Sequence, residues 1–172
     1  MTIYVDMDGV IADFFTELAK HYKVNHWKDL PDRNESVKGL AGTDFFGRLP
    51  KFETSDDLIS FINGVTNGQW SILSSPLRGD HDNSGFWKRH WLKKHNYNPI
   101  DAIFTSRKES YARNKEYKTP NILIDDKSEN INRWVNAGGI GILYQANENS
   151  LEELKIKVHE GLSRVNQLNV KW

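Results

Sequence analysis

The stretch that decides the fold is TIYVDMDGV, residues 2–10. Its first four residues are β-branched or aromatic and end abruptly at Asp6, as expected of a strand that is buried on both faces. Asp8 and then Gly9 follow, so two carboxylates stand one residue apart directly after the strand. Taken alone, this Asp-x-Asp-Gly pattern fits a plain turn or helix cap as well as a functional site. The rest of the chain has to decide between them.

Runs like the first one alternate with segments of helical periodicity along the whole chain. Strands are predicted at 2–5, 69–76, 100–106, 120–126 and 140–144, and helices at 10–22, 54–65, 84–96, 128–139 and 150–168. The helix at 84–96 is expected to carry a basic outer face. Such alternation predicts an α/β fold, a Rossmann-like three-layer sandwich whose mostly parallel five-stranded sheet is covered on both faces. Residues 25–53 lack this periodicity and contain several glycines and prolines, which indicates a small insertion after the first strand.

Composition limits the classes of function that the chain can have. The 172 residues are 38% hydrophobic and 27% charged, enough for one substantial core. Lys plus Arg and Asp plus Glu both number 23, so no overall basic field favours nucleic acid. The absence of cysteine excludes disulfides and thiolate metal sites and fits a reducing compartment, so we expect a cytoplasmic protein. The sequence shows no basic leader and no run of roughly 20 apolar residues. Neither export nor membrane insertion is therefore indicated.

Three of the acidic residues follow predicted strands. Asp6 follows the first strand, and Asp125 and Asp126 follow the apolar run NILI. The carboxyl ends of parallel strands meet at one edge of an open sheet, where ligands bind. Carboxylates that crowd together repel one another, and a divalent cation relieves this repulsion most simply. Mg²⁺ suits ligands that are all oxygen, so we expect a magnesium site at this edge.

Hydroxyl and amine groups are available to complete such a site. Ser74 and Ser75 end the second predicted strand at the same edge, and Lys108 and Lys115 lie between the third and fourth strands. A cation flanked by carboxylates, a hydroxyl and a lysine suits a phosphate group. The chain has no glycine-rich Walker sequence, so a nucleoside triphosphate clamp of that kind is not indicated. Attack of a carboxylate on phosphorus is an established route, and it would use Asp6.

Four short motifs in a fixed order resemble those of the haloacid dehalogenase superfamily of phosphatases. They are DMDGV (6–10), ILSSP (72–76), a lysine downstream, and ILIDDKSEN (122–130). Within that superfamily the chain looks most like the 5'(3')-deoxyribonucleotidases. The resemblance implies a magnesium-dependent phosphomonoesterase that hydrolyses (deoxy)nucleoside monophosphates through an aspartyl-phosphate intermediate. The expected partner is therefore a small phosphate ester, with a nucleoside monophosphate as the main case.

The same resemblance implies a role for each acid. Asp6 would be the nucleophile, and Asp8 would protonate the leaving oxygen and later activate water. Asp6, the backbone carbonyl of Asp8 and Asp125 would bind Mg²⁺, with Asp126 beside the metal or as an alternate ligand. Ser74 would donate a hydrogen bond to the phosphate.

The phosphate-binding lysine has two candidates. Lys115 lies ten residues before Asp125, a spacing that matches the relatives, whereas Lys108 ends a TSRK stretch that resembles their TRDK. We predict Lys115, on the ground that distance to the metal-binding strand limits reach more directly than a short local match.

The insertion would form a helical cap that shields the phosphoenzyme from water and selects the leaving group. We expect Phe14, Phe45 and Phe46 to contact the substrate, with Ser75 and Arg78 completing that set, although aromatic residues here could equally serve packing. The predicted domains are a core of residues 1–13 and 66–172 and a segment of residues 14–65 that holds the cap and its return helix.

Other functions stay open at this stage. The same superfamily includes polynucleotide 3'-phosphatases and sugar phosphatases, and a receiver-like domain that accepts phosphate without turnover also has an acidic magnesium pocket. The neutral charge argues against a long nucleic acid partner, since backbone binding needs several basic contacts. A homodimer is left open.

Overall fold

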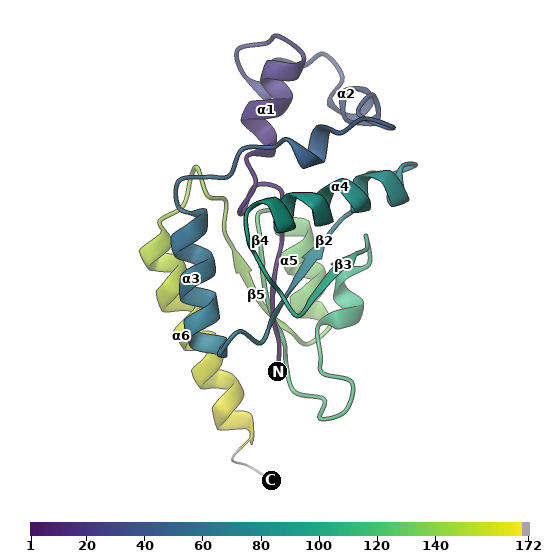
Figure 1. The fold of residues 1–172 in the computed structure, drawn as a ribbon. Helices are drawn as coiled ribbons and strands as arrows, with labels where there is room; N and C mark the ends of the chain where they lie inside the picture. The colour runs from purple at the N-terminus through teal and green to yellow at the C-terminus, as the bar shows by residue number, and fades with distance from the viewer. Residues whose placement is uncertain (170–172) are drawn as a thin grey trace.

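The structure, a computed structural model, describes residues 1–169 and contains one five-stranded sheet (Figure 1). The strands are β1 (Ile3–Val5), β2 (Trp70–Ser74), β3 (Asp101–Phe104), β4 (Ile122–Asp125) and β5 (Ile140–Leu143). Their order is β3-β2-β1-β4-β5, and every neighbouring pair is parallel. In the register, Ile3 lies opposite both Trp70 and Ile122. The predicted α/β fold is confirmed, with a sheet that is wholly parallel.

Helices cover both faces of the sheet and make it the middle of three layers. One face packs against α3 (Ser55–Thr66), α4 (His81–Lys94) and α6 (Leu151–Asn169), and the other against α5 (Ser128–Asn136) and the short 3₁₀ helix η3 (Lys108–Tyr111). The side chains of successive residues in β1 explain this. Ile3 and Val5 belong to the larger apolar cluster, whereas Tyr4 belongs to the smaller one on the opposite face.

The insertion between β1 and α3 lies above the carboxyl ends of the strands, as Figure 1 shows. It consists of α1 (Phe14–His21), the 3₁₀ helix η1 (Trp27–Asp29), α2 (Arg33–Lys38) and the 3₁₀ helix η2 (Phe45–Gly47). We call residues 14–49 the cap. Its buried anchors Leu30, Leu40, Phe45, Phe46 and Leu49 belong to the same apolar cluster as the core strands. The predicted division between core and cap domains therefore stays a prediction.

Two chain segments join the cap to the sheet, and they run side by side. The amide of Asp13 donates to the carbonyl of Pro50 at 2.8 Å, and the amide of Phe52 donates to that of Ile11 at 3.3 Å. Helix α1 begins at Phe14 and not at residue 10, because the amides of Ile11 and Ala12 both turn back to the carbonyl of Met7. This turn places the acids of residues 6–8 directly beneath the cap.

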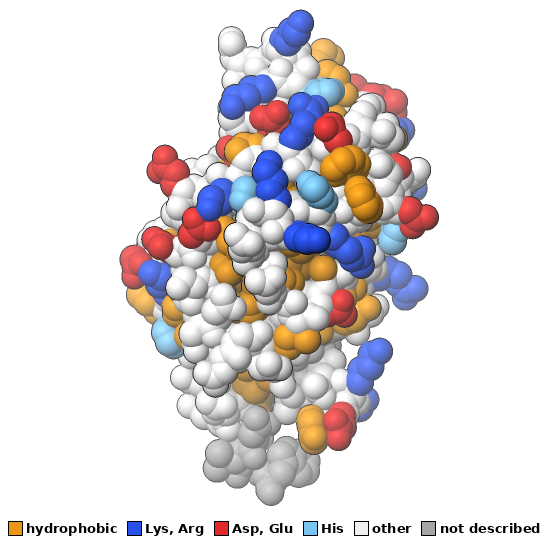
Figure 2. Space-filling view, in the orientation of Figure 1, with side chains coloured by type: hydrophobic (Ala, Val, Ile, Leu, Met, Phe, Trp, Pro, Cys, Tyr) orange, Lys and Arg blue, Asp and Glu red, His pale blue; other side chains and the backbone are white. Residues whose placement is uncertain are grey.

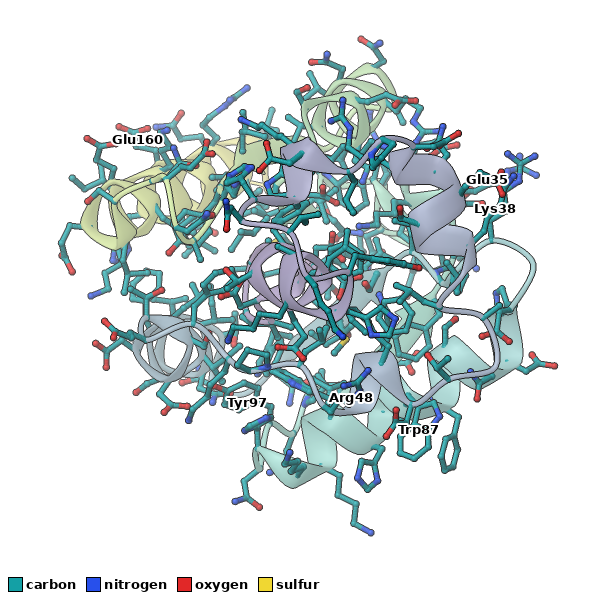
Figure 3. The ribbon with its side chains drawn as sticks, turned by 90° about the horizontal axis from the view of Figure 1, so that it is seen from above. Glu35, Lys38, Arg48, Trp87, Tyr97 and Glu160 are labelled. Carbon is teal, nitrogen blue, oxygen red and sulfur yellow. The ribbon has the colours of Figure 1, made fainter. Side chains whose placement is uncertain are left out.

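Helix α4 clamps the cap onto the core. The side chain of Asn83 donates to the carbonyl of Thr43 at 3.0 Å, and the indole of Trp91 donates to that of Leu49 at 2.7 Å. Gly47 packs so closely on Trp87 that a Cβ atom there would lie 2.4 Å from the indole ring. Figure 3, which looks down onto the cap, shows Trp87 near Arg48 at the edge where the cap and α4 meet.

Surface charge and helix hydropathy follow the sequence-based expectation. The face shown in Figure 2 mixes basic and acidic side chains, in keeping with their equal numbers in the sequence. None of the helices among residues 1–169 is long and apolar enough to span a membrane.

Candidate active site

Acids from two distant segments meet at the carboxyl edge of the sheet. Asp6 follows β1 and Asp125 ends β4, and these two strands are neighbours in the sheet. Both side chains are buried. Carboxylate oxygens of Asp6, Asp125 and Asp126 lie within 4.8 Å of one another. The structure thus brings together three of the four predicted metal-binding acids in one cluster.

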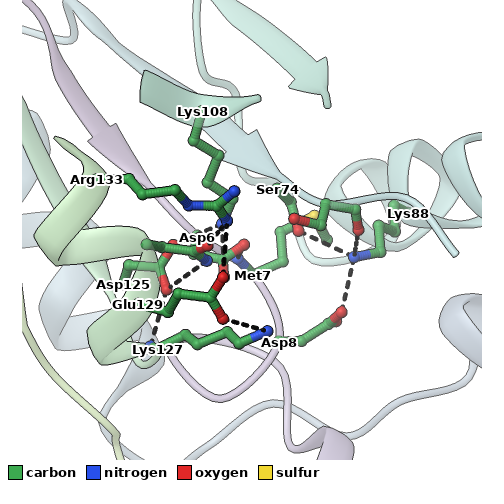
Figure 4. Close-up of polar contacts among 12 residues, drawn as sticks. Asp6, Met7, Asp8, Ser74, Lys88, Lys108, Asp125, Lys127, Glu129 and Arg133 are labelled. Carbon is green, nitrogen blue, oxygen red and sulfur yellow. Dashed lines mark hydrogen bonds and ion pairs between the residues drawn. The ribbon is translucent and has the colours of Figure 1, made fainter. Parts of the chain in front are cut away.

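A buried lysine stands among these acids, and it is Lys108. Its ammonium lies 2.9 Å from Asp6 Oδ2 and 2.6 Å from Asp125 Oδ2 (Figure 4). Burial lowers the pKa of Lys108, but the charges of Asp6 and Asp125 outweigh burial and the net pKa is raised. Lys108 is therefore held in its charged form between the two carboxylates.

The prediction that Lys115 reaches this cluster is wrong. Lys115 is exposed in a turn that is closed by a hydrogen bond from the amide of Lys118 to the carbonyl of Asn114, at 3.0 Å. Residues just before a strand lie at its amino end, whereas Asp125 lies at the carboxyl end of β4. Closeness to Asp125 in sequence was thus a poor measure of reach. The TSRK stretch, which ends at Lys108, was the better guide.

Further groups fix the carboxylate of Asp125. The side-chain amide of Asn130 donates to both of its oxygens at 3.1 Å, and the amide of Lys127 donates to Oδ1 at 2.8 Å. Sequence analysis did not identify Asn130. The available signal was its place five residues after Asp125, in the first turn of α5, where its side chain faces inward and is buried.

Asp8 is turned away from the acid cluster toward a second buried lysine. Its Oδ2 lies 2.7 Å from the ammonium of Lys88, which is 1% exposed and also donates to Ser74 Oγ and to the carbonyl of Ser75, each at 2.9 Å (Figure 4). Sequence analysis missed Lys88 because it assigned the basic residues of this helix to an outer face. Lys88 shares the buried face of α4 with Ser84 and Trp91, a spacing visible in the sequence.

Gly9 allows the backbone to approach Asp126. Its φ is +80°, and a Cβ atom there would lie 2.4 Å from Asp126 Oδ2. Any other residue would be strained at this φ and would displace the Asp126 carboxylate. A glycine is therefore needed at position 9, because the backbone there lies against the side chain of Asp126.

The charges at this edge do not balance. Four carboxylates face two lysines, since Lys108 pairs with Asp6 and Asp125 and Lys88 pairs with Asp8. Burial raises the pKa of Asp126 to about 8, and the charges of Asp6, Asp125 and Asp8 add to the effect. The pKa values of Asp8 and Asp125 are also raised, with burial as the largest cause. An all-oxygen donor set with an excess of negative charge fits a hard divalent cation such as Mg²⁺.

A cavity of about 450 Å³ opens beside Asp8 and beneath the cap. Four of the five predicted substrate-binding residues line it, namely Phe14, Phe46, Ser75 and Arg78. The remaining lining residues are Asn34, Val37, Lys38, Pro76 and Leu77. The rings of Phe14 and Phe46 stack on each other, 6.0 Å apart with an angle of 18° between their planes. The wall of the cavity is thus largely apolar, with cationic groups at Lys38 and Arg78; Figure 3 shows Lys38 on the rim of the molecule.

Phe45 was also expected to contact the substrate, and the structure contradicts this. Its side chain is 0% exposed and is not among the residues that line the cavity. It packs edge-on against both Phe14 and Phe46, with ring centroids 5.7 Å apart in each case. Phe45 supports the aromatic wall from behind, and Phe46 next to it lines the cavity.

A second hollow, of about 720 Å³, lies next to Asp126. Trp27 and Arg33 of the cap line one part of it and Lys127 lines another, and Asn34 borders both hollows. The carboxylates therefore open to the surface on two sides, with Asp8 facing the first hollow and Asp126 the second.

Comparisons with known proteins found a remote structural likeness. No protein-family model matches the chain, and no curated protein matches it. Among solved structures, the chain is similar to a phosphonoacetaldehyde hydrolase-like protein from Oleispira antarctica, with a TM-score of 0.46 and 10% sequence identity over 96% of this chain and 84% of that chain. A likeness at this level does not establish a shared activity, so function has to be argued from the site itself.

Proposed function

We propose that the protein is a magnesium-dependent phosphomonoesterase that hydrolyses (deoxy)nucleoside monophosphates, with Asp6 as the nucleophile. The observation that carries this proposal is the meeting of Asp6 with Asp125, Asp126 and Lys108 at one sheet edge, beside a cavity that Asp8 lines. A buried carboxylate next to a lysine and near a second acid is suited to accept a phosphoryl group.

The reaction has two steps. In the first, an oxygen of the Asp6 carboxylate bonds to phosphorus, the bond from phosphorus to the leaving oxygen breaks, and Asp8 gives that oxygen a proton. In the second, water attacks phosphorus, Asp8 takes the proton of the water, and the bond between Asp6 and phosphorus breaks. The raised pKa of Asp8 supports its part, since an acid protonated nearer neutral pH donates and accepts protons more readily.

Other groups in the site support this chemistry. Lys108 has one hydrogen left after its two carboxylate contacts and would donate it to a phosphate oxygen. Ser74, buried at the end of β2, would donate from its hydroxyl. Asp6, Asp125 and Asp126 would hold Mg²⁺, with the carbonyl of Asp8 as a further ligand. The ion would offset the charge of the phosphate.

The cavity supports a nucleoside as the leaving group. Its volume of about 450 Å³ falls in the range of small-molecule sites, and its aromatic and aliphatic wall offers apolar contact to a planar base. Arg78 is exposed at the wall and would reach polar parts of the substrate. Phe14 and Phe46 provide the aromatic contact.

The strand order argues against a receiver-like phosphate acceptor. The order here is β3-β2-β1-β4-β5, whereas receivers share the 2-1-3-4-5 order of flavodoxin-like folds. Phosphatases that act on polynucleotide 3' ends or on sugar phosphates remain as alternative substrate classes, and they can be separated by direct assay.

The test is phosphate release from a panel of 5' and 3' nucleoside and deoxynucleoside monophosphates, sugar phosphates and a 3'-phosphorylated oligonucleotide, with Mg²⁺ or with EDTA. We expect repeated turnover with Mg²⁺, the highest kcat/KM for a nucleoside monophosphate, and loss of activity in EDTA. Lys108→Ala should reduce kcat/KM by about 100-fold or more, as removal of a charge-stabilising donor does. The matched control Lys115→Ala should not change it. Turnover that stops after one phosphate per enzyme, or no release from any ester, would refute the proposal.

A further inference from the structure

Lys88 has an unusual place for a lysine, on the buried face of a helix. Its side chain is 1% exposed and its ammonium has three partners, namely Asp8 Oδ2 at 2.7 Å, Ser74 Oγ at 2.9 Å and the carbonyl oxygen of Ser75 at 2.9 Å. A buried ammonium is costly unless it is paired and hydrogen-bonded, and here it is both. The position of Lys88 is therefore fixed from three directions (Figure 4).

These contacts use the full hydrogen-bonding capacity of the ammonium. A lysine has three hydrogens to donate, and Lys88 has three acceptors around it. Lys108 differs, because within the described part of the chain its ammonium contacts Asp6 and Asp125 and no third acceptor. Lys108 keeps a donor for a phosphate oxygen, whereas Lys88 has none left. The role of Lys88 must then be exerted through its partners.

The first partner, Asp8, depends on Lys88 for its orientation. Its Oδ2 is bonded to Lys88, and its Oδ1 is buried without a hydrogen-bond partner among residues 1–169. A buried oxygen without a partner stabilises no particular orientation. Among residues 1–169, Lys88 is thus the one group that fixes the orientation of the Asp8 carboxylate through a hydrogen bond.

The second partner, Ser74, is oriented in the same way. Its hydroxyl oxygen accepts the hydrogen bond from Lys88. The hydrogen of the hydroxyl is therefore left to be donated elsewhere, and Ser74 lies at the end of β2, at the edge where Asp6 and Asp125 meet. One ammonium consequently sets the position of an acid and the donor direction of a hydroxyl.

We propose that Lys88 is a positioning residue of this site, which holds Asp8 where it exchanges a proton with the leaving oxygen and directs the Ser74 hydroxyl toward the phosphate. This inference rests on the proposed phosphatase function. It predicts that Lys88 matters most where Asp8 is needed most. Asp8 is needed to protonate a poor leaving group such as a nucleoside alkoxide, but hardly at all to expel p-nitrophenolate, which leaves without a proton.

The first experiment compares Lys88→Met with the wild type on two substrates. With a nucleoside 5'-monophosphate, kcat should fall by about 100- to 10,000-fold, the range for loss of a general acid. With p-nitrophenyl phosphate, the variant should release about one p-nitrophenolate per enzyme in a rapid burst and then turn over slowly, because activation of water still needs Asp8. Lys93→Met is the matched control. Lys93 is exposed on the same helix, so this variant loses the same charge and should behave as the wild type on both substrates.

A second experiment separates the position of the ammonium from the folding of the variant. The chain has no cysteine, so Lys88→Cys can be alkylated at a single site under denaturing conditions with 2-bromoethylamine, which restores an ammonium at nearly the same distance from the backbone. After refolding, the aminoethylated protein should recover at least about a tenth of the wild-type kcat, since each tenfold in rate is only about 1.4 kcal/mol. The same variant alkylated with iodoacetamide carries a neutral group and should not recover.

The outcomes are distinguishable. If the wild type hydrolyses phosphate esters but Lys88→Met slows release of the first product equally for both substrates, with no burst of p-nitrophenolate, or slows neither substrate, the positioning role is overturned and the proposed function stands. Lack of recovery after aminoethylation of a protein that refolds to the wild-type far-UV spectrum also overturns it. In a background that carries both Asp8→Asn and Ser74→Ala, Lys88→Met should change the release of p-nitrophenolate less than twofold, and a further tenfold loss there would contradict action through these two partners. No turnover by the wild type on any ester would overturn the proposed function and this inference together.

Discussion

Asp126→Asn should stabilise the metal-free protein, and the gain should grow with pH. The pKa of Asp126 rises from 3.8 to about 8, because it is buried and lies near Asp6, Asp125 and Asp8. Above pH 4 the folded state therefore holds a proton that the unfolded state has lost. The free energy of unfolding then falls as the pH rises toward 8, since ionisation of Asp126 costs more in the folded state. Asparagine cannot ionise, so the variant escapes this loss.

The size of the effect follows from the same shift. A rise from 3.8 to about 8 corresponds to about 6 kcal/mol if Asp126 bore all of the repulsion alone. Asp6 and Asp125 share that repulsion, and water reaches the part of Asp126 that is exposed, so we expect about 2 kcal/mol above pH 8. Near pH 3, below the ordinary pKa of 3.8, the carboxyl group is mostly neutral in both states, and the two proteins should differ by less than about 0.5 kcal/mol.

Urea unfolding in EDTA, followed by tryptophan fluorescence, measures this directly. The chain has six tryptophans, and Trp70, Trp91 and Trp134 among them are buried, so their fluorescence reports unfolding. Glu160→Gln is the control, because Glu160 is exposed on α6 and lies at the outer edge of the molecule in Figure 3. A variant no more stable than the wild type at about pH 8.5, or a difference that does not depend on pH, would refute the repulsion argument. Added Mg²⁺ should stabilise the wild type more than Asp126→Asn.

Three further predictions concern single residues. Gly9→Ala should abolish phosphate release even where the protein folds, because the added Cβ would displace the Asp126 carboxylate; activity within tenfold of the wild type would contradict this. Phe14→Ala should raise KM for nucleoside monophosphates by about 10-fold with little change for p-nitrophenyl phosphate, in steady-state assays, through loss of aromatic contact; equal effects on both would point to misfolding. The pKa of His95 is lowered, mainly by burial and further by the charges of Lys51 and Lys94. The unfolded state therefore binds a proton near pH 6.5 that the folded state does not, and the free energy of unfolding should fall as the pH drops from about 6.5 toward the lowered pKa. Chemical unfolding between pH 7 and 5 should show a shallower fall for His95→Phe, and an unchanged slope would exclude this histidine as the cause.

Much of the fold could be predicted because the signal is local. Each buried strand is a short apolar run, and each of the five runs overlaps a strand of the structure. Once the strands are known to be parallel, their carboxyl ends define an edge, and Asp6 and Asp125 have to lie on it. Their convergence also requires β1 and β4 to be neighbours in the sheet, which the structure shows and the sequence did not predict.

The sequence did not reveal features that depend on which way a side chain points or on which end of the sheet a segment reaches. Lys115 is near Asp125 in sequence, yet it precedes the amino end of β4 and lies at the wrong end of the sheet. Phe45 and Phe46 are adjacent and both pack against Phe14, and nothing in the sequence says which of them lines the cavity. Lysine is usually a surface residue, and the only sign in the sequence that Lys88 points inward is its helical spacing from the buried residues Ser84 and Trp91.

The central claim is that Asp6 takes the phosphoryl group. The most direct measurement is rapid acid quenching of the protein after mixing with p-nitrophenyl phosphate and Mg²⁺, followed by mass spectrometry of its peptides. We predict one phosphoryl group on the peptide that contains Asp6, formed before steady-state turnover and absent from Asp6→Asn. A phosphoryl group on another residue, or turnover by the wild type with no covalent phosphate at any quench time, would contradict the claim.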